Sequence, residues 1–236
     1  MEDLCIEVKL DDEAYYEAFL TDVTDTEIVV TFENLETAVG AVGVLAPKRV
    51  PFARSRLPPL KNTIGAALSY AEGQEIEVYS RKYDLGPDFG WWRATIKMMK
   101  GEFFVVEHID WKDDIVNRTE IISVDTIRVP NPNPPLTKDD FVKFEVSVPM
   151  DLRVYAKREG VHKEFQRIIG AAICRFVPES DTLVCISLAD WSERAANDFK
   201  DMISIHFECL REQVLQFESI IEEYLKSIEE EAMPVR

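Results

Sequence analysis

Hydrophobic and polar residues alternate over most of the sequence up to residue 130, as they do in β-strands that bury one face. The first alternating segment spans residues 6–10, and others follow at 14–23, 28–32 and 50–56. Polar turn residues separate these segments at hairpin spacing. Short strands in this arrangement predict a small antiparallel barrel.

The same order of strands returns later in the sequence. An alternating strand comes first, a strand that opens with two aromatic residues comes second, and two further strands follow. The corresponding segments are 6–8 and 76–78, 15–18 and 91–94, 27–33 and 102–107, and 50–56 and 122–128. A pattern that recurs in one order indicates that the barrel is duplicated.

The pattern changes after residue 135. A strand is followed by a helix that opens with proline and acid, by a second short helix, by two strands and by a long helix. The segments are 141–148, a helix from 149, 161–169, 172–176, 182–188 and a helix from about 192. This is the element order of a type I KH domain.

Two proline-rich segments divide the chain and read as linkers. We therefore predict a mixed β and α+β protein with two tandem small barrels and a KH-like α+β domain. The expected boundaries are a barrel at 1–58, a linker at 59–73, a barrel at 74–129, a linker at 130–136, a KH-like domain at 137–217 and an acidic helical tail at 218–236.

Short strings of residues, each weak alone, occur in one order along these domains. They are Met1–Leu4 with Glu7-Val8, Val78–Arg81, Trp91-Trp92, Lys100–Phe103, Asn131–Asn133, Val148-Pro149 with Asp151–Arg153, and His162–Phe165. Together they resemble the fragile X family of RNA-binding proteins over about residues 1–217. The resemblance implies tandem Tudor-type (Agenet) barrels, a KH-like domain, and binding to mRNA or ribonucleoprotein complexes. It also implies regulation of translation in the cytoplasm, with shuttling to the nucleus.

The sequence departs from the family pattern in three places. The segments 38–46 and 109–118 lengthen one loop in each barrel. The two RNA-binding KH domains of the family and its Arg-Gly-rich tail do not occur in these 236 residues. We therefore expect either part of a longer protein or a short relative.

Charge limits where RNA could bind. The chain has 44 acidic and 27 basic residues, and its net charge of -17 repels a phosphate backbone. Residues 138–175 are an exception, with eight basic against six acidic residues. The candidate nucleic-acid contacts there are Arg153, Lys157, Arg158, Lys163 and Arg167. Gly160 is the only glycine where an RNA-clamping KH domain has Gly-x-x-Gly, so a solvated helix face is the alternative.

Aromatic residues are concentrated in the second barrel. Several rings around a methylated ammonium group attract it through their negative faces. By resemblance, the candidates for methyl-lysine or peptide binding are Tyr79, Trp92 and Phe104, with His108 where relatives carry a tyrosine and Trp111 as a substitute. Small barrels also need aromatic residues in their cores, and the sequence leaves both interpretations open.

The last helix carries apolar residues at spacings of three and four. Its later members, Ile221, Leu225 and Ile228, extend past a KH-like core. They predict a partner helix or a homodimer contact, with fraying of the helix as the alternative.

Chemistry-bearing motifs are few. The sequence has no glycine-rich phosphate loop, no H-E-x-x-H motif and no C-x-x-C pair among its four cysteines, so we expect no enzyme, metal or cofactor, and reduced thiols. Its apolar runs are short and its first residues acidic, so we expect an intracellular protein without membrane contact. The alternative functions are a nuclear chromatin reader of methylated histone tails and a protein–protein or dimerisation scaffold without RNA contact.

Overall fold

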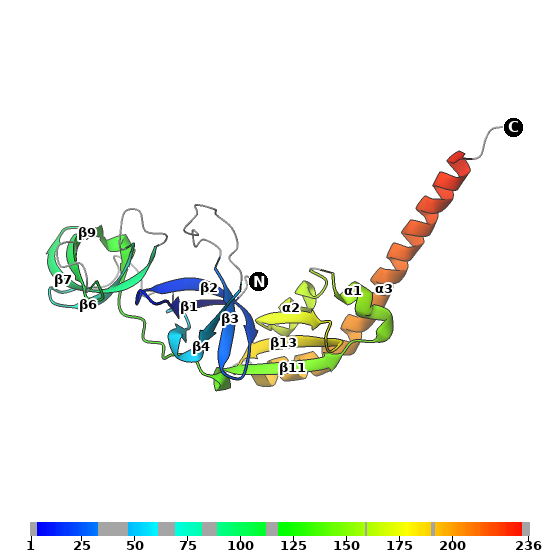
Figure 1. Ribbon diagram of the computed structural model, residues 1–236, viewed down its shortest axis with the longest axis horizontal. Helices are drawn as coiled ribbons and strands as arrows, with labels where there is room; N and C mark the ends of the chain where they lie inside the picture. Colours follow the sequence, from blue (N-terminus) through cyan, green and yellow to red (C-terminus); the bar gives the residue numbers. More distant parts are fainter. Residues whose placement is uncertain are drawn as a thin grey trace. The chain divides into compact units, whose positions relative to one another are not determined.

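The structure is a computed structural model in which two compact units, residues 2–138 and 139–236, are described separately (Figure 1). The residues that it describes are 4–32, 47–60, 69–81, 89–111, 118–158, 160–189 and 192–232.

The first barrel is a curved antiparallel sheet of five short strands (Figure 1). The strands are β1 (Cys5–Lys9), β2 (Tyr15–Val23), β3 (Glu27–Thr31), β4 (Lys48–Pro51) and β5 (Ser55–Arg56). Hydrogen bonding places them in the order β5-β1-β2-β3-β4. The 3₁₀ turn η1 (Phe52–Arg54) carries the chain directly from β4 at one edge to β5 at the other, which is how a small barrel brings its edges together.

The second barrel repeats this arrangement. Its elements are β6 (Glu75–Ser80), β7 (Gly90–Lys100), β8 (Phe103–His108), β9 (Thr119–Ser123), η3 (Val124–Thr126) and β10 (Ile127–Arg128), and the strand order is β10-β6-β7-β8-β9. Each barrel has an irregularity at the same place in its second strand, between Leu20 and Asp22 in β2 and between Ile96 and Met98 in β7. The duplication predicted from the sequence is therefore present in the backbone.

The two barrels meet where β2 pairs with β7, with Tyr15 opposite Trp91. Gly90 begins β7 beside this pair. A β-carbon at that position would lie 2.9 Å from the ring of Tyr16, closer than such contacts allow. Glycine therefore permits the close approach of β7 to the first barrel.

A buried cluster of four charges also joins the barrels. Arg56 donates from Nε to Glu7 Oε2 and from Nη2 to Glu77 Oε1, both at 2.8 Å. Arg128 donates from Nε to Glu77 Oε2 at 2.8 Å, and its Nη1 lies 2.6 Å from Glu7 Oε1. No side chain of the four is more than 9% exposed. Each barrel thus contributes one glutamate and one arginine at equivalent positions, and both arginines bridge both glutamates.

Aromatic rings cover the arginines of this cluster. The guanidinium of Arg56 lies 3.5 Å from the centre of the Tyr15 ring, and that of Arg128 lies 3.7 Å from the centre of the Trp91 ring. Planar guanidinium groups stack on such rings while their edges donate to carboxylates. The paired residues of β2 and β7 therefore also shield the charges from water.

The second proline-rich segment packs against the first barrel. Asn131 Nδ2 donates to Glu7 Oε2 at 3.0 Å and to the carbonyl of Leu57 at 2.9 Å. Asn133 Nδ2 donates to the carbonyls of Leu57 and Pro58 at 3.0 and 2.9 Å. These bonds satisfy the carbonyls of Leu57 and Pro58. A backbone bond from the Leu136 amide to the Ser55 carbonyl at 2.8 Å also holds the segment against the first barrel.

The second unit has the predicted order of strand, helix, helix, strand, strand and helix. Its elements are η4 (Lys138–Asp140), β11 (Phe141–Ser147), η5 (Met150–Leu152), α1 (Arg153–Ala156), α2 (Lys163–Ile169), β12 (Ile173–Val177), β13 (Thr182–Leu188) and α3 (Ser192–Ala232). The three strands are antiparallel in the order β11-β13-β12. Gly170, with φ +68°, ends α2 in the left-handed conformation that glycine adopts readily.

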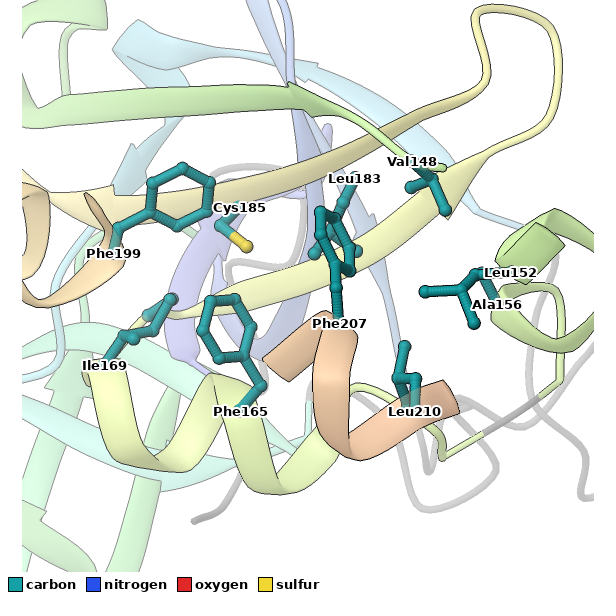
Figure 2. Packing of buried hydrophobic residues seen from close by; sticks show 11 residues of the cluster. Val148, Leu152, Ala156, Phe165, Ile169, Leu183, Cys185, Phe199, Phe207 and Leu210 are labelled. Atoms are coloured by element: carbon teal, nitrogen blue, oxygen red, sulfur yellow. The ribbon is translucent and has the colours of Figure 1, made fainter. Parts of the chain in front are cut away.

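The core of this unit lies between the helices and one face of the sheet. Figure 2 shows Phe165 of α2 and Phe207 of α3 pointing toward Leu183 and Cys185 of β13. Leu210 of α3 lies at the end of this core nearer α1 (Figure 2). Burying a side chain of this size stabilises a fold by about 1.5–3 kcal/mol. The first half of α3 is therefore part of the domain.

The second half of α3 extends past this core. Leu215, Phe217, Ile220 and Ile221 are 42–64% exposed. The side chains of Leu225 and Ile228, predicted to contact a partner helix, lie outside the described residues. Among the described helices none is long and apolar enough to cross a membrane.

One cysteine prediction is wrong. Cys174 and Cys185 lie opposite each other across β12 and β13 and form a disulfide. The spacing of the cysteines in the sequence gives no sign of this bond. Only the register of β12 on β13 places the two residues opposite each other.

Candidate functional site

The turn between α1 and α2, residues 157–162, is the part of a KH-type domain where a phosphate backbone can approach. The amide of Arg158 donates to the carbonyl of Tyr155 at 2.9 Å, and the amide of Lys163 donates to that of Gly160 at 3.1 Å. Gly160 has φ +80°, which a residue with a β-carbon rarely adopts. The chain thus turns tightly at Tyr155–Arg158 and again at Gly160–Lys163, and Gly160 is exposed.

Three of the five predicted nucleic-acid contacts gather at this turn. Lys157, Arg158 and Lys163 are exposed, and none forms an ion pair with another described residue. They lie within three residues of Gly160 in the sequence. Their charges are therefore available to an anion.

The other two predicted contacts are already neutralised. Arg153 lies 2.6 Å from Asp181 and donates to the carbonyl of Val148 at 3.1 Å. Arg167 pairs with Glu164 one helical turn earlier. The structure therefore separates the predicted set into three cations without an ion pair among the described residues and two paired cations.

Helix α3 supports the turn from behind. The guanidinium of Arg158 lies 4.9 Å from the centre of the Tyr155 ring and 4.8 Å from that of Phe217. The hydroxyl of Tyr155 donates to Gln213 Oε1 at 3.0 Å. These contacts limit the movement of the Arg158 side chain. They also give Gln213 and Phe217, which lie past the core, contacts with the turn.

Two histidines connect the same turn to α3. His162 Nε2 lies 3.0 Å from the carbonyl of Ala156, which can only accept, so this nitrogen carries the proton. His162 Nδ1 then accepts from His206 Nε2 at 2.9 Å. The ring of His206 also stacks on Phe165, with centres 4.3 Å apart. This arrangement requires His162 to be neutral, because its Nδ1 accepts, whereas His206 Nε2 can donate from either protonation state.

Burial favours that neutral state. It lowers the pKa of His162, and the bond to the Ala156 carbonyl opposes part of this shift. Burial, and secondarily the charge of His162, lower the pKa of His206 from 6.5 to about 4. Both rings are therefore neutral at pH 7, and the histidine pair holds the turn in place.

The predicted aromatic set divides differently in the second barrel. Trp92, His108 and Trp111 come together but are at most 4% exposed. The rings of His108 and Trp111 stack with centres 3.8 Å apart, and Trp92 meets Trp111 edge to face at 5.6 Å. In this conformation the three rings cover one another, so the described residues form no open cage.

The other two predicted ligands lie apart. Phe104 belongs to the barrel core, where it contacts Tyr70. Tyr79 lies on the outside, 44% exposed, with its ring 5.5 Å from that of Phe89 and 5.1 Å from that of Trp91. Alternation along a strand sends neighbours to opposite faces, so Tyr79 cannot share a face with the inward Val78 or Ser80.

Polar partners accompany the buried rings. Trp92 Nε1 donates to the carbonyl of Ser80, and His108 Nε2 lies 2.9 Å from Glu120 Oε2. Burial works to raise the pKa of Glu120, but hydrogen bonds from His108 and Ser80 outweigh it and lower the pKa. His108 Nδ1 and Trp111 Nε1 are buried and meet no partner among the described residues. An ionised carboxylate therefore adjoins the rings.

Sequence reasoning did not single out the buried charge cluster or Glu120. A signal for the cluster was present, because aligning the repeats places Glu7 on Glu77 and Arg56 on Arg128. Oppositely charged residues at equivalent strand positions in both copies indicate a shared contact.

These features define a class of protein, in which two small Tudor-type barrels precede a KH-type domain with a basic turn. Residues 4–60 match the Tudor domain of Fragile X messenger ribonucleoprotein 1, residues 73–133 match the Agenet domain, and residues 138–223 match the FMRP KH0 domain. The chain belongs to the fragile X family, and its domains are those of an RNA-binding protein of that type. These domain families are RNA-binding or reader types and not catalytic ones.

A solved structure is also similar to part of the chain. It is the crystal structure of Arabidopsis thaliana AGDP1 AGD34, which is 18% identical and has a TM-score of 0.43. The similarity covers 55% of this chain and 81% of that one.

Proposed function

We propose that the protein is a cytoplasmic ribonucleoprotein adaptor that regulates translation, and that its KH-like domain contacts RNA phosphates through Lys157, Arg158 and Lys163. The observation that carries this proposal is the group of three exposed cations near Gly160, none of which is ion-paired among the described residues. Family membership supports the assignment to RNA-associated work.

The same geometry limits the strength of the contact. Only one glycine lies in the turn, so the backbone approaches phosphates less closely than in a Gly-x-x-Gly clamp. The net charge of -17 opposes binding elsewhere on the surface. Affinity should therefore be modest, local and sensitive to salt.

Replacing Lys157, Arg158 and Lys163 together with alanine should weaken binding of the whole chain to a single-stranded oligouridylate about tenfold or more. Loss of three phosphate contacts should also reduce the slope of log affinity against log salt by about 2, at about 0.7 per contact. Fluorescence anisotropy at several salt concentrations measures both quantities.

A matched control removes the same charge elsewhere in the domain. Lys143, Arg153 and Arg167 are each paired with a carboxylate. Their triple alanine variant should keep the affinity within a few-fold and the slope almost unchanged. Equal losses in the two variants would show that the turn is not the RNA contact.

A second candidate function is recognition of methylated lysine or another peptide by the Tudor pair. It is favoured by the buried rings of Trp92, His108 and Trp111 beside the Glu120 carboxylate, since rings and an anion together attract methylammonium groups. Trp111 would have to leave its stack on His108 to admit the guest. Binding to histone tails would instead make the protein a nuclear chromatin reader.

Trp111→Ala should weaken binding of a trimethyl-lysine peptide about tenfold, because one desolvated ring contributes about 0.5–2 kcal/mol. Trp111→Phe should retain most of the affinity, and Phe89→Ala, which removes an exposed ring, should retain all of it. Calorimetric titration of the folded variants measures this. Equal affinity of the parent protein for methylated and unmethylated peptide would exclude methyl-lysine recognition.

A further inference from the structure

The outer face of the second barrel carries a strip of exposed apolar side chains. Met98 is 56%, Phe103 60% and Ile121 73% exposed. Val105 of β8 lies opposite Met98 of β7 and opposite Ile121 of β9. These four residues, the apolar strip, therefore form one continuous surface across three strands.

The strip ends at an unpaired sheet edge. Strand β9 is bonded to β8 on one side, and no described strand pairs with its other side. The amide of His108 donates to the carbonyl of Arg118, and the amide of Val124 donates to that of Glu102. This register turns the backbone groups of Thr119 and Ile121 away from β8. Strand β9 thus presents backbone donors and acceptors beside exposed apolar side chains.

The first barrel protects the equivalent edge. There Val29 lies opposite Asp22 and Arg49, the counterparts of Met98 and Ile121 in the repeat. Pro51, the counterpart of Ser123, has no amide hydrogen to donate. Charged side chains and proline are the usual means by which edge strands avoid pairing. Strand β4 therefore has both forms of protection, and β9 has neither on its outer face.

The acidic side chain opposite Thr119 of β9 is already paired within the barrel. Glu107 pairs with Lys97 at 2.5 Å and with Arg118 at 3.5 Å. The outward residues of β9 are Thr119, Ile121 and Ser123, none of which is charged. A neighbouring strand could therefore approach without burying an unpaired charge.

The size of this surface indicates its occupant. A stable protein dimer needs about 800 Å² from each partner, much more than four side chains and one five-residue strand supply. A single extended peptide matches the length of β9. Main-chain bonds would give such a peptide affinity, and alternate side chains would give it specificity.

We propose that the free edge of β9 binds an extended peptide segment of a partner protein as an added strand, with an apolar side chain of the peptide placed beside Ile121. This site is independent of the function proposed above, because it uses neither the cations at the α1–α2 turn nor the buried rings of the second barrel.

The first barrel supplies the test variant. Ile121→Arg with Ser123→Pro gives β9 the two residues that protect β4. Proline fits at residue 123 because Ser123 has φ -86° and ψ 150°, close to φ -58° and ψ 142° at Pro51. Arg49→Ile, made in the first barrel, is the matched control and leaves Pro51 in place.

The probe is a displayed library of short random peptides, selected on the whole chain and then resynthesised. Selected peptides should alternate apolar and polar residues. The double variant should weaken them about tenfold or more, since it removes an apolar contact and a backbone donor. The Arg49→Ile control should bind like the parent. Methylating alternate peptide nitrogens should abolish binding, and bound peptide should slow hydrogen exchange of the Ile121 amide in the parent.

Several results would overturn the proposal. The parent could select no peptide, the double variant could bind as tightly as the parent, or N-methylated peptides could retain their affinity. If the parent sediments as a dimer and the double variant as a monomer, the edge of β9 binds a second copy of the chain instead. The hydrogen-exchange measurement needs no variant and decides the matter if the double variant does not fold.

Discussion

Arg128→Ala is expected to lower the free energy of unfolding of the barrel unit by about 3–5 kcal/mol, the usual cost of leaving a buried charge without its partner. The variant leaves the carboxylates of Glu7 and Glu77 with Arg56 as their one remaining cation in the cluster. It also uncovers the face of Trp91. Urea unfolding, with hydrogen exchange of β1 and β6 amides to assign the transition, measures the loss.

Arg54→Ala is the control for this experiment. Arg54 pairs with Asp11 at 2.6 Å, but the Asp11 side chain is 88% exposed. Surface pairs contribute about 0–1 kcal/mol because water and salt screen them. Similar losses of unfolding free energy in the two variants would show that the buried cluster stabilises the protein no more than a surface ion pair. Other contacts, such as β2–β7 pairing, would then hold the barrels together.

Acidification is expected to destabilise the KH-like unit between about pH 6.5 and 4. The pKa of His206 is about 4 in the folded protein and 6.5 without structure, so folding favours the neutral ring. Its contribution is complete above the unfolded pKa and is lost as the pH falls toward the folded value. Because His206 is only partly buried, we expect about 1–2 kcal/mol rather than the full value of the shift.

His206→Gln separates this effect from other titrations. The glutamine amide can donate to His162 Nδ1 but has no ionisable proton in this range. Its stability should therefore change less between pH 6.5 and 5, where Asp151 remains ionised because Arg211 lowers its pKa. The comparison uses the unfolding midpoint of the KH-like unit at each pH, followed through the amide signals of β12 and β13. Parallel pH profiles for parent and variant would exclude the histidine pair as the sensor.

The repeat and the element order could be predicted from the sequence because both depend on local periodicity. Alternation in segments 6–10 and 76–78 is enough to define strands, and Gly170 is enough to end α2. The position of the three basic residues at the turn could also be predicted, since the order of elements places residues 157–163 between two helices. Order, spacing and charge are all properties of the chain in one dimension.

The direction in which each ring points could not be predicted in this way. A period of two gives two faces but does not say which is inside, so Trp91 and Trp92 are equivalent until β7 is placed in the barrel. The structure turns Trp92 into the interior and gives Trp91 to the charge cluster. Which aromatic residues could line a cage therefore depends on which face of each strand turns inward, and only the packing of the folded barrel decides this.

The sequence by itself determined two repeated barrels, a KH-like domain and a local surplus of positive charge, because these follow from residue order. Only the tertiary structure decided that Glu7, Arg56, Glu77 and Arg128 meet, that Cys174 faces Cys185, and that β9 is left without the protection of β4. Each of these contacts joins residues through strand register or barrel packing. Such distances depend on how hydrophobic burial and hydrogen bonding bring separate segments together, and the local pattern of any one segment does not fix them.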